Sequence, residues 1–144
     1  MKRTFYLLCS VALNLLLLTG LASCSKESAE AKKVNVAAMT DALKSPDKDA
    51  RINACVELAK AGPRAAAATQ SLIPVLKDAD PVVRRLAAYA LGEIGPEAKA
   101  ALPALKETLN DSDREVIMQV VNSLRSIDPK NYSGLKNETT SGPQ

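Results

Sequence analysis

The chain has no histidine and no tryptophan, and aromatic side chains make up only 3% of its 144 residues. Without histidine the chain lacks the commonest general base and the commonest metal ligand, so it cannot form a Ser-His-Asp or Cys-His catalytic set. A glycine-rich phosphate-binding loop is also missing. We therefore expect no catalytic residue, no metal site and no cofactor, and we expect that the protein is not an enzyme.

Cysteine is scarce, with Cys9, Cys24 and Cys55 as its three instances. Cys9 lies in an apolar N-terminal segment that Cys24 closes, so only Cys55 is expected within the folded part, where no internal disulfide can form. Cys55 falls on the apolar stripe of a predicted helix, which is typical of a small core residue. Arg51 lies one turn earlier, and a nearby positive charge is typical of a reactive thiol, which is the alternative. We favour the buried position.

A strong excess of positive charge is missing as well. The chain has 19 basic and 16 acidic residues, and without residues 1–23 the balance becomes 17 to 16. Nucleic-acid binding depends on lysine and arginine that neutralise phosphates. We therefore expect no nucleic-acid partner.

The N-terminal segment has the pattern of a secretory signal. Lys2 and Arg3 precede the apolar residues 5–18, and the segment ends in Leu21-Ala22-Ser23-Cys24. A positive start, a short apolar stretch and small residues before a cleavage point describe such a signal. The final four residues resemble the lipobox of bacterial lipoproteins. This resemblance implies a signal peptide over residues 1–23, cleavage between Ser23 and Cys24, and lipidation of Cys24. An uncleaved membrane anchor is the alternative, because residues 5–22 reach the lower limit of a spanning helix.

Either interpretation predicts a membrane protein of the bacterial cell envelope that faces away from the cytoplasm. Ser25 follows the cysteine, and by resemblance to lipoprotein sorting it favours the outer membrane in a double-membraned cell. Residues 24–36 are small and charged, which predicts a lipidated tether. Residues 130–144 are polar and contain two glycines, which predicts a disordered tail.

The rest of the chain repeats with a period of about 33 residues, and self-similarity at a fixed period of this length is the signature of a solenoid. Leu43, Leu76 and Leu109 lie one period apart, and Asp47, Asp80 and Asp113 keep the same spacing. Each of the three aspartates is placed to cap a helix, because a short carboxylate accepts hydrogen bonds from the first free backbone N–H groups. Glycine or aspartate followed by proline stops the first helix of each repeat. The expected helices cover about residues 35–44, 48–61, 64–77, 81–94, 97–109 and 114–127.

The middle repeat, residues 76–95 with its continuation to Leu105, resembles the HEAT-like repeats, including the short form of bilin lyase-type proteins. The resemblance covers about residues 37–129. It implies an all-α fold, an α-α superhelix of the armadillo/HEAT type with about three short repeats.

The same resemblance implies a polar ladder in which an aspartate and an arginine six residues later bond between repeats. Asp78 and Arg84 match this pair. Arg51 is present but Ser45 replaces its aspartate, and Asp111 is present but Ile117 replaces its arginine, so a partial ladder is expected. The carboxylates at these turns are expected to cap helices rather than to bind calcium, which needs six or more oxygen ligands.

A solenoid presents an extended surface, and the second helices at 64–77 and 97–109 are expected to form it. This pattern predicts a protein-interaction or scaffold module with an unknown protein partner, held to the membrane by lipid. Arg85 and Tyr89, one turn apart, are weaker candidates for a contact on another helix edge. Two alternatives remain open: an accessory factor similar to bilin lyase-type proteins, and a structural envelope lipoprotein.

Overall fold

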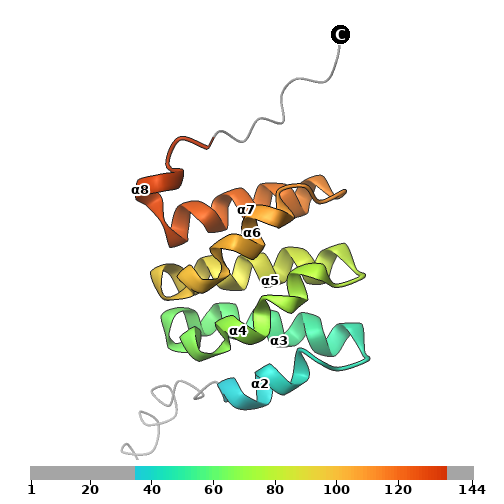
Figure 1. Ribbon diagram of the computed structural model, residues 1–144. Coiled ribbons are helices and arrows are strands. Elements are labelled where there is room, and N and C mark those ends of the chain that lie inside the picture. Colours follow the sequence, from blue (N-terminus) through green and yellow to red (C-terminus); the bar gives the residue numbers. More distant parts are fainter. Residues whose placement is uncertain (1–34, 136–144) are drawn as a thin grey trace, which may run out of the picture. The chain divides into compact units, whose positions relative to one another are not determined.

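The computed structural model describes residues 35–135, which form a stack of helices without strands (Figure 1). Three helices of fourteen residues form the layers of the stack: α3 (Lys48–Ala61), α5 (Pro81–Ile94) and α7 (Arg114–Ile127). Their bounds coincide with the ranges expected from the sequence. Cys24, Ser23, the signal segment, almost all of the proposed tether and residues 136–144 lie outside the described residues.

Each of the three long helices begins at an aspartate that accepts hydrogen bonds from its first turn. Asp80 accepts from the N–H of Val82 at 2.9 Å, and Asp113 accepts from the N–H of Glu115 at 2.8 Å. Asp47 accepts from the N–H of Asp49 at 3.1 Å. These bonds satisfy backbone donors that have no partner within the helix. Because the three caps occupy equivalent places in successive repeats, the helices begin at one edge of the stack.

The ends of the long helices explain why the chain reverses there. Gly62 and Gly95 have φ values of 57° and 75°, a backbone conformation that side chains with a Cβ rarely adopt. The following prolines, Pro63 and Pro96, cannot continue the hydrogen-bonding of the preceding helix. At the third end Asp128 takes the place of the glycine, with an ordinary φ of −141°.

The second helices, expected at about 64–77 and 97–109, are each divided between 3₁₀-helix and α-helix. The first consists of η1 (Gly62–Ala68), α4 (Thr69–Leu72) and η2 (Pro74–Lys77), where η marks 3₁₀-helix. The second consists of η3 (Gly95–Ala101) and α6 (Leu102–Thr108). The sequence therefore predicted where the second helices lie, but it did not predict their 3₁₀ segments.

The buried residues explain the 3₁₀ segments. In η1 they are Gly62, Ala65 and Ala68, and the equivalent residues of η3 are also buried. A spacing of three matches the three residues per turn of a 3₁₀-helix, so one narrow face meets the core. Pro74 then interrupts the first of these helices, because it has no N–H to donate to the carbonyl of Gln70.

Shorter helices close the two ends of the stack. The helix α2 (Val36–Ala42), capped by Asn35, packs against α3. The helix α8 (Pro129–Tyr132) follows α7, and Leu135 packs against the core. The folded part therefore extends beyond residue 129, where the sequence placed its end. The Asp128-Pro129 turn begins one more helix, as the equivalent glycine-proline turns do in the two preceding repeats.

Small and branched apolar side chains form one continuous core between the layers. Leu58, Leu91 and Leu124 are each 0% exposed and take the same place in successive repeats. Such equivalent positions show that each layer buries its stripe against its neighbours. Among residues 35–135, no helix has both the length and the apolar character needed to cross a membrane.

Candidate interaction surface

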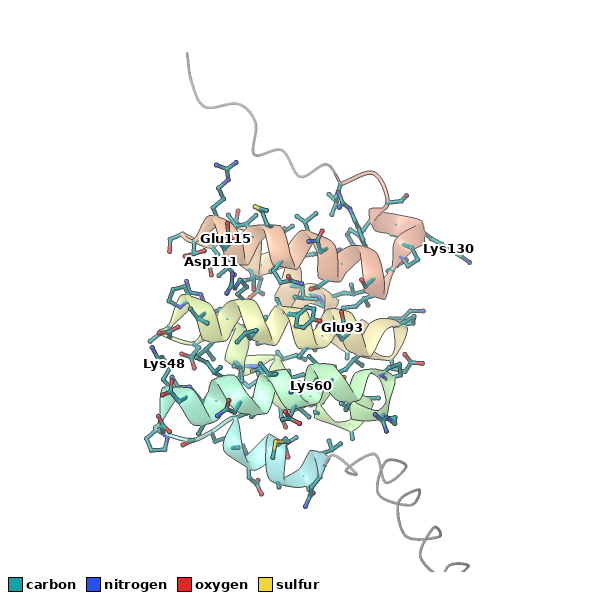
Figure 2. All side chains as sticks on the ribbon, turned by 180° about the vertical axis from the view of Figure 1, so that it is seen from behind. Lys48, Lys60, Glu93, Asp111, Glu115 and Lys130 are labelled. Atoms are coloured by element: carbon teal, nitrogen blue, oxygen red, sulfur yellow. The ribbon has the colours of Figure 1, made fainter. Side chains whose placement is uncertain are left out.

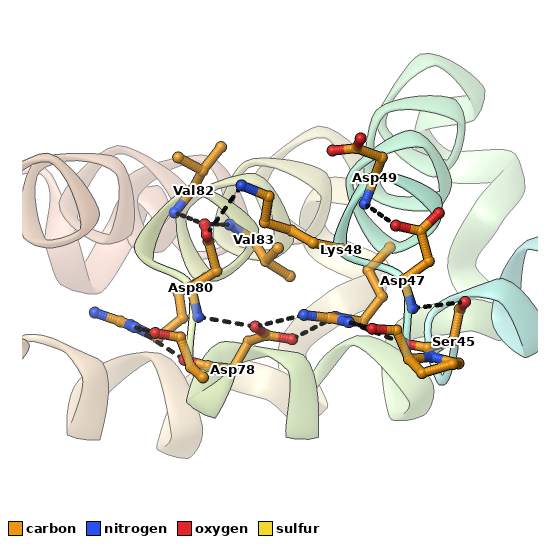
Figure 3. Close-up of polar contacts among 12 residues, drawn as sticks. Ser45, Asp47, Lys48, Asp49, Asp78, Asp80, Val82 and Val83 are labelled. Carbon is orange, nitrogen blue, oxygen red and sulfur yellow. Dashed lines mark hydrogen bonds and ion pairs between the residues drawn. The ribbon is translucent and has the colours of Figure 1, made fainter.

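The predicted ladder residues meet at the edge where the long helices begin (Figure 3). Arg51 donates from Nε to Oδ2 of Asp78 at 2.7 Å and from Nη2 to Oδ1 at 3.1 Å. Its Nη1 donates to the carbonyl of Ser45 at 2.9 Å. Thus Ser45, which lacks the carboxylate of the pattern, contributes its backbone instead. Arg51 joins the turn before α3 to the turn before α5.

One repeat later the same arrangement recurs. Arg84 donates to both carboxylate oxygens of Asp111, at 2.7 Å and 2.8 Å, and to the carbonyl of Asp78 at 2.9 Å. The carboxylate of Asp111 also accepts from the N–H of Asp113 at 2.8 Å. The ladder therefore spans both junctions between the long helices, and Ile117 provides no arginine for a third.

The charges of the ladder are mutually stabilised. Hydrogen bonds from Arg84 lower the pKa of Asp111 below its ordinary value, against the opposing effect of burial. Burial raises the pKa of Asp78, but bonds from Arg51 and from the N–H of Asp80 outweigh it and leave that pKa lowered. Both carboxylates thus stay ionised and occupied by their arginines. This geometry fixes neighbouring repeats and leaves little of either carboxylate free for a ligand.

Cys55 lies inside the core, as its position on the apolar stripe predicted. Its side chain is 0% exposed, and burial raises its pKa to about 12. The thiolate is the nucleophilic form of cysteine, and here it is strongly disfavoured at neutral pH. Within residues 35–135, no three histidine, cysteine, aspartate or glutamate side chains are grouped to hold a metal ion.

Arg85 and Tyr89 lie on α5. Figure 2 shows the face that the three long helices form, with Lys60 and Glu93 labelled. Arg85 Nη1 is 3.8 Å from Oε2 of Glu115, and the two side chains are 42% and 65% exposed. Tyr89 and Val82 are the exposed large apolar side chains among the described residues, each at 39%. Val82 and Arg85 line a small hollow of about 120 Å³ between the starts of α5 and α7.

The second helices form a different surface, with three adjoining hollows of about 430, 460 and 370 Å³. The first lies between the end of α2 and the η2 region, and its lining includes Lys44 and Pro74. The second lies between η2 and α6, and its lining includes Pro74, Ala100 and Pro103. Because neighbouring hollows share lining residues, we call this surface the second-helix groove.

The third hollow shares Lys77 and Glu107 with the second. Lys77 Nζ and Glu107 Oε2 are 3.1 Å apart, so one ion pair joins the two walls of the groove. The side chains are 73% and 66% exposed. The groove thus combines small apolar and proline side chains with lysines along its length.

The sequence pattern identified the second helices as a candidate surface, yet it did not identify Lys44, which lies beyond α2. A usable signal was present, because Lys44 and Lys77 lie one repeat apart, immediately after the aligned Leu43 and Leu76. The pattern also could not show that Pro74 lines two hollows at once, since this depends on how α2, η2 and α6 pack.

Comparison with known families gives one result that covers most of the chain. A family model described as HEAT repeats matches residues 36–125, which include α2 to α7 almost completely. No curated protein matches the chain.

Proposed function

Because this chain belongs to the HEAT-repeat family, we propose that it acts as a non-enzymatic protein-interaction or scaffold module, anchored by lipid at the bacterial cell envelope. The second-helix groove is the observation that carries this proposal. It runs from the end of α2 across η2 to α6, and such a surface suits contact with an extended partner.

The side chains of the groove favour a protein ligand that approaches closely. Ala100 and Ala104 are short, and Pro74 and Pro103 present rigid apolar surface without a backbone N–H. A partner backbone can therefore lie near the helices, and its apolar side chains can enter the hollows. Lysines beside the hollows add polar contacts, which chiefly contribute specificity.

Anchoring through Cys24 would place this groove outside the cytoplasm. The lipobox-like residues Leu21-Ala22-Ser23-Cys24 support cleavage after Ser23, and Ser25 supports the outer membrane. More than one acyl chain is needed for stable anchoring, and lipoproteins carry two or three. Ten residues of tether, if extended, would let the domain reach at most ~35 Å from the bilayer.

The interaction is tested by blocking the groove. Ala100→Arg fills the second hollow, whereas Ser126→Arg places the same side chain at an exposed position of α7. We expect a partner crosslinked to the full-length protein in detergent-solubilised membranes to be lost with Ala100→Arg and kept with Ser126→Arg. Equal capture by both variants would contradict the proposal.

The anchor is tested separately with Cys24→Ser and cell fractionation. We expect the variant to leave the membrane fraction or to accumulate with its signal segment attached. Membrane-bound variant of mature size would show that lipid on Cys24 is not the anchor.

A further inference from the structure

The exposed side of α5 carries a row of three side chains, Arg85, Tyr89 and Glu93, each four residues after the previous one. Residues spaced by four lie on the same side of a helix, about 6 Å apart along its axis. This side is opposite the stripe that α5 buries in the core, and it belongs to the face that the long helices form (Figure 2). We call these three residues the α5 row.

The two ends of the α5 row carry opposite charges that the neighbouring side chains leave available. Arg85 lies 3.8 Å from Glu115, but this ion pair is exposed, and exposed ion pairs contribute little free energy. Lys60, at the place in α3 equivalent to Glu93, is bonded instead to Glu57 at 2.8 Å. The row therefore presents a positive charge before Tyr89 and a negative charge after it.

This charge pattern is complementary to itself when two copies meet in antiparallel orientation. Arg85 of each copy then faces Glu93 of the other, and Tyr89 meets Tyr89 near the two-fold axis. A parallel arrangement would bring Arg85 against Arg85 and Glu93 against Glu93, and like charges placed opposite each other repel. Closed two-fold dimers, in which each contact occurs twice, are the commonest homo-oligomers.

The helix geometry permits the same arrangement. A row of residues spaced by four is a ridge on the helix surface, and two helices whose ridges of this kind interdigitate cross at about 50°. Tyrosine and arginine are enriched among the interface residues that contribute most to binding. Val56 of α3 and Met118 of α7, at places equivalent to Tyr89 and Arg85, are partly exposed beside the row and widen the contact.

We propose that the α5 row forms the centre of a two-fold interface with a second copy of this chain. The inference goes beyond the proposed function, because it uses the long helices and leaves the second-helix groove free for a partner. A helix of this length spans about 21 Å, and three layers about 8–10 Å apart give the face an area of about 500 Å². Two such faces bury at most about 1,000 Å², near the lower limit of a specific interface, so the dimer is weak and depends on concentration.

The test uses sedimentation equilibrium of the full-length protein in detergent over a series of protein concentrations. We expect wild type to dimerise as its concentration rises, and high salt to weaken the dimer. Arg85→Glu and Glu93→Arg should each weaken it about tenfold, because each places like charges opposite each other. Lys44→Glu makes the same change of charge as Arg85→Glu at an exposed position beside the second-helix groove, and it should leave the dimer unchanged.

Restored pairing separates this interface from general repulsion between the copies. The double variant Arg85→Glu/Glu93→Arg reverses both charges and should dimerise nearly as strongly as wild type. An equimolar mixture of the two single variants should form a mixed dimer more readily than either variant associates with itself. A wild type that stays monomeric at every concentration, or a double variant as weak as the single ones, would overturn the inference.

The two proposals fail independently. Ala100→Arg changes the groove, so it should dimerise as wild type does even when it loses the crosslinked partner, and Arg85→Glu should keep that partner. A monomeric wild type that loses its partner with Ala100→Arg would refute the dimer alone. A dimeric wild type that keeps its partner with Ala100→Arg would refute the groove alone.

Discussion

Gly92 of α5 lies directly against Ser123 of α7, and the contact leaves no room for a side chain. A Cβ added at Gly92 would come within 2.9 Å of the Oγ of Ser123 and 3.1 Å of its Cα. The Ser123 hydroxyl donates to the carbonyl of Ala88 at 2.6 Å, so it cannot move away freely. This pair sets how closely the second and third layers of the stack approach.

Gly92→Ala should therefore destabilise the fold, although alanine is the better helix former. The gain in helix propensity is up to about 1 kcal/mol, whereas overpacking a close contact costs about 1–3 kcal/mol. We expect a lower urea midpoint with an unchanged slope. Gly134→Ala is the matched control, because no atom lies within 4 Å of its added Cβ and its midpoint should stay unchanged. A urea midpoint that rises in Gly92→Ala would show that the second and third layers can move apart without loss of stability.

The ladder pair Arg84–Asp111 should contribute more than the exposed pair Lys77–Glu107. The first pair is 13% and 9% exposed and is bidentate, whereas the second is 73% and 66% exposed. In double-mutant cycles to alanine, measured by urea unfolding, we expect a coupling of about 1.5–3 kcal/mol for Arg84–Asp111 and below about 1 kcal/mol for Lys77–Glu107. Similar couplings would indicate that the ladder has no special role.

The long helices were predictable because local chemistry determines them. Asp47, Asp80 and Asp113 mark their starts, and Gly62 and Gly95 mark two of their ends, so each boundary follows from one or two neighbouring residues. The family resemblance pointed to Asp78 and Arg84 as ladder residues in a partial ladder. In the structure their side chains pair with other repeats, because Arg51 bonds Asp78 and Arg84 bonds Asp111. Fold class and repeat length therefore followed from the sequence.

The second helices were less predictable because tertiary packing determines their form. An alanine-rich segment fits both α-helix and 3₁₀-helix, and the buried triplet Gly62, Ala65 and Ala68 decides between them only once a core exists. The groove was missed in detail for the same reason, since Lys44 and Pro74 line one hollow only through the packing of α2 on the first repeat. Past residue 129 the chain contacts α6 through side chains that lie far apart in the sequence, with Lys106 Nζ over the Tyr132 ring, 5.5 Å from its centre.

Acid should weaken the fold through the ladder carboxylates. The pKa of Asp111 is lower in the folded protein than its ordinary value, so the folded state binds the proton less readily than the unfolded state. Its stabilising effect is therefore complete at neutral pH and is lost as the pH falls from about 4 through the folded pKa. We expect Asp111→Asn to be less stable than wild type at pH 7, and the difference to shrink toward pH 3. The free energy of unfolding is measured with urea at each pH. A difference between wild type and Asp111→Asn that stays constant from pH 7 to pH 3 would exclude this linkage.

The thiol of Cys55 should react only when the core opens. It is 0% exposed and its pKa is raised to about 12, so both access and ionisation oppose attack on a disulfide reagent. We expect a chain with Cys9 and Cys24 replaced by serine to label slowly at pH 8 and rapidly in urea. Tyr89→Cys in the same background should label rapidly without urea, because position 89 lies in solvent. Fast labelling of Cys55 in the native state would mean that the first and second layers separate far more often than their burial implies.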